Sequence, residues 1–485
     1  MDHMTRTREI LGQLIGFPTV SADSNMALIE HLAGLLADAG ARIEVFRDET
    51  GTKANLFATI GPDIDGGILL SGHSDVVPVA DQDWTTDPWA MTEREGRLYG
   101  RGTCDMKGFI AASLALVPEF LATQRARPVH LAFSYDEEIG CAGAPVMINQ
   151  LKAEGARFDG CVVGEPTSMQ VVVAHKGINL YRCRVHGKAA HSSLTPRGSN
   201  AIEYAARLIC RIRDIADHFK AHGPYDEFFD VPFTTMTTNQ IQGGIAVNTI
   251  PELCEFAYEF RNLPGMSVDG IQAQVESYVR DELLPRMRAE FADARIEIET
   301  GASAPALEAS EEAAITQLVR ALTADQEKRK VAYGTEAGLF HNAGIPTVVC
   351  GPGSIEQAHK PNEFIALSQI GEYLVEATQE RFQLEVAPDG SLWEPLAPET
   401  IRRKNGDTRI LRQSSTLIDT ILYDVSDNML LVGSNMEYAA THQFGREADG
   451  IPAREWLGLT TGPWNDEVAI MDILYDHFNQ DLPNR

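Results

Sequence analysis

Residues 66–79 read GGILLSGHSDVVPV. The apolar run that opens this stretch predicts a central strand of a sheet, and it leads into two chemically active side chains, His73 and Asp75. Side chains two positions apart in an extended segment lie on the same face, so these two point the same way. A buried strand followed by acidic residues recurs at residues 128–138, PVHLAFSYDEE, and at residues 158–167, FDGCVVGEPT. This repetition indicates an α/β domain whose site lies along one edge of the sheet.

The order of the predicted elements divides the chain into segments. Residues 178–300 follow the order β-α-β-β-α-β, which is typical of a compact α+β sandwich, and the alternation of strands and helices resumes at residues 311–350. The middle unit is therefore inserted into the α/β domain. None of the seven cysteines lies beyond position 350, whereas three of the five tryptophans do, so we expect a boundary near the C-terminal quarter.

Composition limits the class of protein. The 485 residues are 44% apolar and 23% charged, as in ordinary globular proteins, and the formal net charge is -28. Such an acidic chain repels phosphate groups, so we expect neither nucleic acid nor a membrane as a partner. No apolar run approaches the roughly 18 residues of a membrane span, and the N-terminal sequence lacks the cleavage site of a signal peptide. The scattered cysteines form no CxxC pair, which favours reduced thiols in a cytoplasmic protein.

Five candidate metal ligands follow predicted strands or lie in loops near them: His73, Asp105, Glu138, Glu165 and His359. Two imidazoles and three carboxylates suit a pair of Zn²⁺-like ions that share one carboxylate. Of the adjacent Glu137 and Glu138 only one needs to bind a metal, and the other is free to act as a base on bound water. Each residue taken alone is more often a structural histidine or a solvated loop carboxylate. Their recurrence along one sheet edge favours the metal centre.

Two neighbours of these ligands also have predicted roles. Asp75 would accept the second ring proton of His73 and so orient the imidazole. Cys104 stands beside Asp105 but has no evident histidine base in the sequence, so we interpret it as a buried thiol and not as a nucleophile.

Nine motifs carry a resemblance to a known family: SGHSDVVPV, GRGTCDMKGFIA, SYDEEIG, VVGEPT, AHKG, AHSSLTPRGSNA, AVNTIPELCEF, YGTEAGLF and GPGSIEQAHKPNEF. In order and spacing they resemble the acetylornithine deacetylases, of the two-zinc aminoacylase and desuccinylase peptidase family, over about residues 5–368. The resemblance implies a zinc-peptidase-like catalytic domain, residues 1–177 and 301–369. The inserted residues 178–300 would form an α+β lid and dimerisation domain.

The resemblance also implies a ligand set and a mechanism. One Zn²⁺ would lie on His73 and Glu165 and the other on Glu138 and His359, with Asp105 as the bridge, giving two zinc ions per subunit that Co²⁺ would be able to replace. Asp75 would orient His73, and Glu137 would be the general acid/base. The peptide bond after the bridging aspartate is cis in that family, so we expect a cis bond between Asp105 and Met106.

Substrate contacts follow from the same resemblance. His191, in the AHSS motif of the lid, would stabilise the oxyanion from the partner subunit of a homodimer. Arg261, in EFRNLPG, would bind the substrate α-carboxylate, with Asn248 as its companion. Each of these three has an alternative interpretation as a surface or rim residue of the lid.

The loop YGTEAGLF bears on specificity. It contains Thr335 and Glu336, which we expect to contact the substrate, and it carries Leu339 where the related succinyl-diaminopimelate desuccinylases carry an arginine that meets an extra carboxylate. A neutral acetyl group therefore fits better than a succinyl group, and Glu336 would attract a substrate ammonium. The leading interpretation is hydrolysis of N2-acetyl-L-ornithine to acetate and L-ornithine, in arginine biosynthesis. The alternatives are an acetylcitrulline deacetylase, a succinyl-diaminopimelate desuccinylase or a dipeptidase.

Residues 370–485 depart from that family. The motifs WEPLAPETIRRK, YAATHQFG and IPAREWLGL resemble the phage virion morphogenesis (tail completion) proteins, over about residues 370–480. This resemblance implies a small α+β domain with contacts in phage assembly and no catalysis. A fusion of two genes explains both resemblances, and it leaves open a structural assembly protein whose hydrolase part is inactive.

Overall fold

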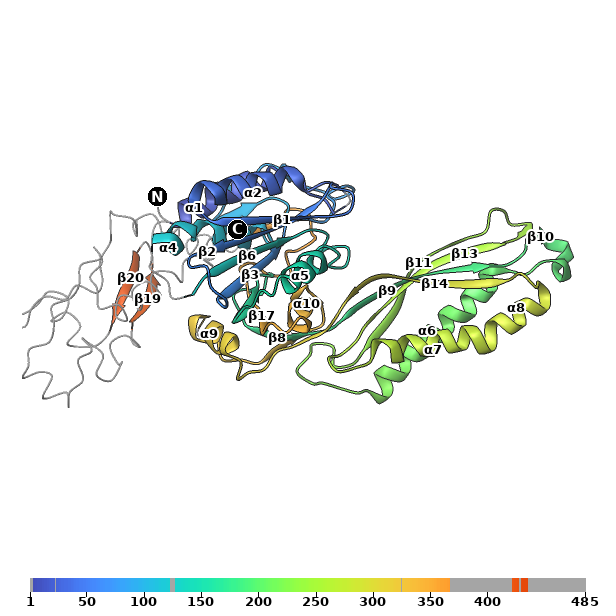
Figure 1. Ribbon diagram of the computed structural model, residues 1–485. Coiled ribbons are helices and arrows are strands. Elements are labelled where there is room, and N and C mark those ends of the chain that lie inside the picture. The colour runs from blue at the N-terminus through green and yellow to red at the C-terminus, as the bar shows by residue number, and fades with distance from the viewer. Residues whose placement is uncertain are drawn as a thin grey trace, which may run out of the picture.

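The computed structural model describes residues 3–366 apart from residues 22, 123–126 and 324, and it describes residues 421–426 and 429–434. Figure 1 shows a layered α/β domain from which a long second sheet, backed by helices, extends to one side. Within the described residues, no helix combines the length and apolar character needed to cross a membrane.

The central sheet has nine strands, in the order β1-β2-β6-β3-β7-β17-β8-β15, with β16 beside β8. Strand β3 runs parallel to both β6 and β7, so the carboxyl ends of these three strands meet at one edge of the sheet. The nine strands are β1 (Arg42–Arg47), β2 (Ala54–Ile60), β3 (Ile68–His73), β6 (Val129–Ser134), β7 (Gly160–Val163), β8 (Val172–His175), β15 (Leu307–Glu308), β16 (Arg329–Val331) and β17 (Thr347–Val349).

Helices cover both faces of this sheet (Figure 1). Leu56 of β2 packs with α1, α2 and α3, whereas the next residue, Phe57, packs with α5 and α10, because successive strand residues point to opposite faces. Gly40 ends α2 in the left-handed conformation, with φ at 94°. The helices of this domain are α1 (His3–Ile15), α2 (Met26–Ala39), α3 (Lys107–Ala115), α4 (Val117–Ala122), α5 (Ala144–Ala153), α9 (Ala314–Thr323) and α10 (Ala337–Asn342).

The helical segment between Lys107 and Ala122 is interrupted. Helix α3 ends at Ala115, and α4 begins after Leu116. Pro118, the second residue of α4, has no N–H to donate. In a continuous helix its ring would also clash with the carbonyl of Leu114, so the helix breaks here.

The second sheet is antiparallel, in the order β11-β13-β9-β14, and it is the long sheet that extends from the α/β domain in Figure 1. Along β13, Cys254, Phe256, Tyr258 and Phe260 alternate with less buried residues and pack under the helices, as the two-residue period of a strand requires. The elements of this sheet and its helices are β9 (Ile178–His186), β10 (Ala190–His191), η1 (Ser192–Arg197), α6 (Ala201–His222), β11 (Thr235–Gly243), β12 (Thr249–Ile250), β13 (Leu253–Arg261), α7 (Val268–Tyr278), the π-helical turn η2 (Val279–Leu283), α8 (Leu284–Glu290) and β14 (Arg295–Ala304).

Two small sheets complete the described elements. Strand β18 (Phe364–Ala366) pairs with β5 (Arg97–Tyr99), which pairs with β4 (Thr92–Arg94). Strands β19 (Ile421–Ser426) and β20 (Met429–Ser434) form an antiparallel hairpin. The predicted C-terminal domain, residues 370–485, otherwise lies outside the described residues.

Candidate metal centre and active site

The five predicted ligands come together at the carboxyl edge of the central sheet. His73 is the last residue of β3, Glu138 follows β6, and Glu165 follows β7. Asp105 lies in the loop before α3, and His359 lies in the loop before β18. Four of the five side chains are buried, whereas the His359 side chain is 54% exposed and marks the mouth of the site.

Asp105 lies between the two histidines. Its Oδ1 is 3.0 Å from His73 Nε2, and its Oδ2 is 3.3 Å from His359 Nε2. His73 Nε2 is also 3.9 Å from Glu165 Oε1, and His359 Nε2 is 2.9 Å from Glu138 Oε2. One oxygen of Asp105 therefore faces each histidine–glutamate pair, which is the arrangement expected of a bridging carboxylate.

The donor set fits a pair of metal ions. In the described part of the chain, the buried atoms Glu138 Oε1 and Glu165 Oε1 have no hydrogen-bond partner. Burial raises the pKa of both carboxyls, and the negative charge of Asp105 raises them further. Uncompensated buried carboxylates are unfavourable, and imidazole and carboxylate groups at this spacing are ligands for Zn²⁺ and related ions. Divalent cations would satisfy both orphan atoms.

Asp75 connects His73 to the loop after β6. The nearer acceptor of His73 Nδ1 is the backbone carbonyl of Asp75, at 2.9 Å, whereas the Asp75 carboxylate is 3.6 Å away. That carboxylate accepts the N–H groups of Glu137 at 3.0 Å and Glu138 at 3.2 Å, and the hydroxyl of Ser21 at 2.7 Å. Burial favours a higher pKa for Asp75, but its contact with His73 and these hydrogen bonds outweigh burial and lower the pKa. The backbone carbonyl of Asp75 is thus closer to the His73 ring than the carboxylate that was predicted to accept its proton.

Glu137 precedes the candidate ligand Glu138, but its carboxylate lies near His73 and Glu165, whereas that of Glu138 contacts His359. One of its carboxylate oxygens lies within 4.8 Å of ligand atoms of His73 and Glu165. The thiol of Cys141 donates to Glu137 Oε1 at 3.3 Å. Burial raises the pKa of the Glu137 carboxyl; the nearby His73 opposes this, and the neighbouring Glu138 adds to it. A raised pKa suits a group that must accept and return a proton near neutral pH.

The loop that carries Asp105 has two expected features. The Asp105–Met106 peptide bond is cis, as the family resemblance implied. Cys104 is 1% exposed and its thiol donates to the carbonyl of Ser354, so it is a buried thiol as predicted. Burial raises the pKa of this thiol strongly, which does not suit a nucleophile.

Sequence reasoning missed Glu363, although its motif, HKPNEF, was recognised. The Glu363 side chain is 1% exposed and forms an ion pair with Arg101 at 2.7 Å. Its carboxylate also accepts the backbone N–H of Asp105 at 3.0 Å. Both members of the pair lie in motifs that carry the resemblance, Arg101 in GRGTCDMKGFIA and Glu363 in GPGSIEQAHKPNEF, but nothing in either motif indicates that the two are partners.

The predicted lid residues lie apart from the metal centre within one chain. His191 and Thr249 are paired across β10 and β12, and the carbonyl of Asn248 accepts the N–H of Ser192. Both His191 and Asn248 are exposed, and Figure 1 shows β10 at the end of the lid that is farthest from the central sheet. Arg261 is the last residue of β13, at the end of that strand away from β12, and it pairs with Glu259 at 3.1 Å.

The two predicted contacts in the YGTEAGLF loop are corrected by the structure. Glu336 is completely buried, and its carboxylate accepts the hydroxyls of Ser71 and Ser134, each at 2.6 Å. Thr335 is 1% exposed, and its hydroxyl accepts the N–H of Ala337 at the start of α10. Neither side chain is available to a substrate, so the prediction that Glu336 attracts a substrate ammonium is wrong. Charge alone suggested that contact, and burial removes it.

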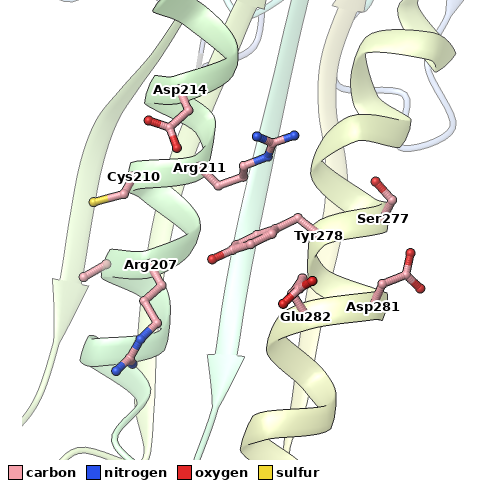
Figure 2. Close-up of a pocket in the computed structure, with 9 residues that line it drawn as sticks. Arg207, Cys210, Arg211, Asp214, Ser277, Tyr278, Asp281 and Glu282 are labelled. Carbon is pink, nitrogen blue, oxygen red and sulfur yellow. The ribbon is translucent and has the colours of Figure 1, made fainter.

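A surface groove of about 670 Å³ lies on the lid between α6 and the helix formed by α7 and η2 (Figure 2). Two of its three acidic residues, Asp281 and Glu282, pair with Arg280 of η2 and Arg286 of α8. No predicted ligand or catalytic residue lines it. The groove is therefore a solvated surface feature separate from the metal centre.

The comparison with known proteins agrees with this geometry. The model of peptidase family M20/M25/M40 matches residues 69–375. This chain belongs to that family. Acetylornithine deacetylase of Proteus mirabilis (strain HI4320) is 36% identical over 370 residues, which cover 75% of this chain and 92% of the relative. Acetylornithine deacetylase of Salmonella typhimurium (strain LT2) is 38% identical over 366 residues, which cover 74% and 92%.

Solved structures show the M20 fold. An M20 family metallo-carboxypeptidase from Sulfolobus solfataricus matches with a TM-score of 0.62 at 18% identity, over 76% of this chain and 96% of that chain. A tripeptidase from Staphylococcus aureus matches with a TM-score of 0.58 at 19% identity, over 76% and 94%. Fold and family together make this chain a metal-dependent hydrolase.

The C-terminal resemblance is also supported. The model of the phage virion morphogenesis family matches residues 355–479, so the two family matches overlap at residues 355–375. The M20-family hydrolase region is therefore followed directly by a region similar to a phage protein.

Proposed function

We propose that this chain is a two-zinc hydrolase that removes the acetyl group from N2-acetyl-L-ornithine, releasing acetate and L-ornithine. The observation that supports it most is Asp105, whose two oxygens face His73 and His359 across a cluster with orphan carboxylate atoms. The similarity to acetylornithine deacetylases favours an acetylated amino acid over a peptide as the substrate. A cytoplasmic role in arginine biosynthesis follows from that substrate.

The chain's own residues have separable tasks in this reaction. Zinc ions bound here would polarise the acetyl carbonyl and lower the pKa of a bound water to about 7. Glu137, next to the ligand cluster and held at one oxygen by Cys141, is placed to take the proton of the attacking water. It would then deliver that proton to the departing amine of ornithine, so acid and base are the same carboxyl group.

The lid sheet has an exposed apolar edge that favours a dimer. Strand β11 is the edge of the lid sheet, and the exposed apolar residues Ile241, Ile245 and Val247 lie on it or just after it. An apolar sheet edge is a favourable surface for pairing with a second copy. We infer a homodimer in which His191 of one chain completes the site of the other, because His191 lies at the far end of its own lid (Figure 1).

The division of the chain into domains belongs to the same proposal. Residues 1–177 and 301–369 would be the catalytic domain, residues 178–300 the lid and residues 370–485 an appended domain similar to the phage family. The appended domain would contribute contacts with phage assembly proteins and no catalytic group.

Ornithine release from N2-acetylornithine by the purified, zinc-loaded full chain tests the function. We expect turnover with acetylornithine to exceed turnover with succinyl-diaminopimelate, because Leu339 offers no cation for a succinyl carboxylate and is partly buried in the core. Acetylcitrulline and dipeptides complete the panel. If another compound of the panel is hydrolysed faster, that compound replaces acetylornithine as the proposed substrate. If protein that holds two zinc ions hydrolyses none of them, the chain is not a deacylase.

Substitution of Arg261 tests carboxylate binding. We expect Arg261→Met to lower kcat/KM by about 10- to 100-fold, mainly through KM, because a charge-assisted contact worth roughly 1.5–3 kcal/mol is lost. Steady-state kinetics measure this. Arg184→Met is the matched control, since Arg184 pairs with Glu255 and Glu299 on the same lid sheet but away from the substrate. An unchanged KM in Arg261→Met would remove Arg261 from the site.

A further inference from the structure

Glu363 organises the loop that carries the bridging aspartate. Its Oε1 accepts the backbone N–H of Cys104 at 2.8 Å and of Asp105 at 3.0 Å. Its Oε2 accepts the N–H of Gly102 at 3.1 Å and Nη1 of Arg101 at 2.7 Å. The Glu363 carbonyl also accepts the N–H of Gly100 at 3.0 Å. One buried side chain therefore satisfies three backbone donors of this loop, and both of its oxygens are used.

Arg101 joins this loop to the loop of the second histidine. The Arg101 side chain is 1% exposed, and its Nη1 donates to the carbonyl of Lys360 at 3.3 Å as well as to Glu363. Its guanidinium lies 5.0 Å from the centre of the Trp84 ring. A planar guanidinium with several donors can hold two segments at once, which a lysine could not do in the same way.

The histidine loop needs such support. His359 has a φ of 64° and Asn362 a φ of 56°, both in the left-handed region. A histidine in this conformation persists only when its surroundings hold it there. Gln82 Nε2 donates to the His359 carbonyl at 3.0 Å, and Asn362 Oδ1 accepts the N–H of Thr85 at 2.7 Å. With Arg101 on Lys360, the loop is held at three of its residues.

We propose that Glu363 and Arg101 form a clamp that sets the position of Asp105 relative to His359 and so selectively maintains the metal held by His359 and Glu138. The inference rests on the proposed two-zinc site and deepens it. The other metal would share Asp105, but its two remaining ligands are set by the central sheet, because His73 ends β3 and Glu165 follows β7. The metal on His359 has only Glu138 from that sheet, so it depends more on the clamp. Glu363 and Arg101 act as positioning residues, because neither touches the ligand atoms themselves.

Glu363→Gln tests the clamp with little change in size. An amide can accept at only one end, so its NH₂ group must face backbone donors, and the loop loses one side of its attachment. Positioning partners of metal ligands typically contribute about 10- to 100-fold to metal affinity. We expect the full-length variant to hold one zinc ion per chain at a free zinc concentration that loads two in the unmodified chain. Excess zinc should restore the second ion and the activity.

The controls separate positioning from general stability. Glu311→Gln changes another Glu–Arg pair, in which the Arg320 side chain is 4% exposed and 2.9 Å away. Arg320 also donates to the carbonyls of Asp325 and Glu327, and neither of these is a predicted ligand. We expect it to keep two zinc ions. The melting temperature of each metal-free chain is measured alongside. If Glu363→Gln does not fold, the same zinc titration is carried out on Arg101→Met, which leaves the Glu363 carboxylate in place.

The outcomes are distinct. Two zinc ions bound to Glu363→Gln with unchanged affinity would overturn the clamp. So would loss of both ions together with the fold in Glu363→Gln and Arg101→Met, since that result indicates a purely structural pair. If the unmodified chain itself does not bind two zinc ions, the proposed function fails first and the inference falls with it.

Discussion

Glu137→Gln is expected to lower kcat for acetylornithine hydrolysis by about 10²- to 10⁴-fold, the usual contribution of a general acid/base. The amide has nearly the size of the carboxyl but cannot take or return a proton. The backbone N–H of Glu137 would still donate to Asp75, so the loop and the neighbouring ligand Glu138 stay in place. Zinc content should therefore be unchanged. Steady-state kinetics and metal analysis of the same sample measure both quantities.

Asp136→Asn is a matched control for this variant. Asp136 lies one residue earlier and pairs with Lys53, outside the ligand cluster. Its φ of 54° is one that asparagine tolerates well, so the backbone should not change. We expect kcat within a few-fold of the unmodified chain. Loss of a zinc ion in Glu137→Gln would instead identify Glu137 as a ligand and transfer the role of base to Glu138.

His191→Ala is the second substitution with a large expected effect. Removing one donor to the oxyanion typically lowers kcat by about 10²- to 10³-fold. Zinc binding should not change, because His191 is exposed at the tip of the lid and contacts no ligand (Figure 1). Among the described residues, the His191 ring contacts the hydroxyl of Ser193 at 2.8 Å and accepts the N–H of Ser193 at 3.3 Å, so its hydrogen bonds stay within its own loop. His218→Ala removes an exposed lid histidine from α6 and should leave kcat unchanged.

A mixture of two inactive variants shows which chain supplies His191. In a dimer of one Glu137→Gln chain and one His191→Ala chain, one site receives an intact Glu137 and an intact His191 if the histidine acts across the interface. Half of the dimers in an equal, re-equilibrated mixture are mixed, so about a quarter of full activity should return. No recovery, with mixed dimers confirmed by sedimentation of tagged chains, would mean that His191 acts within its own chain or not at all.

The ligand set illustrates what local sequence can predict. His73, Glu138 and Glu165 each follow a buried strand whose apolar residues are visible in the sequence, and these strands, β3, β6 and β7, are parallel neighbours. Parallel neighbours place their carboxyl ends on one edge, so the side chains after them had to be close. The same argument could not distinguish which glutamate faces which histidine. That depended on the loops before α3 and β18.

Glu336 shows the opposite case. Its position in a polar loop motif suggested a substrate contact, but the chain buries it against Ser71 of β3 and Ser134 of β6. A glutamate is rarely buried unless it has a partner, and the local sequence does not show where such partners lie. The burial of Glu336 was therefore not predictable from its motif. The partners here are 265 and 202 residues away.

By itself, the sequence indicated the α/β class, the three neighbouring strands β3, β6 and β7 of the central sheet, the inserted α+β unit, the candidate metal ligands that meet at one edge, and the cis bond after Asp105. Hydrophobic periodicity, strand order and recognisable motifs are local properties, so they survive without coordinates. Only the tertiary structure decided that Asp105 presents one oxygen to each histidine, that Glu336 is buried, and that Glu363 holds Asp105 from 258 residues away. Those contacts depend on how distant loops pack at one sheet edge, and no periodicity along the chain encodes that packing.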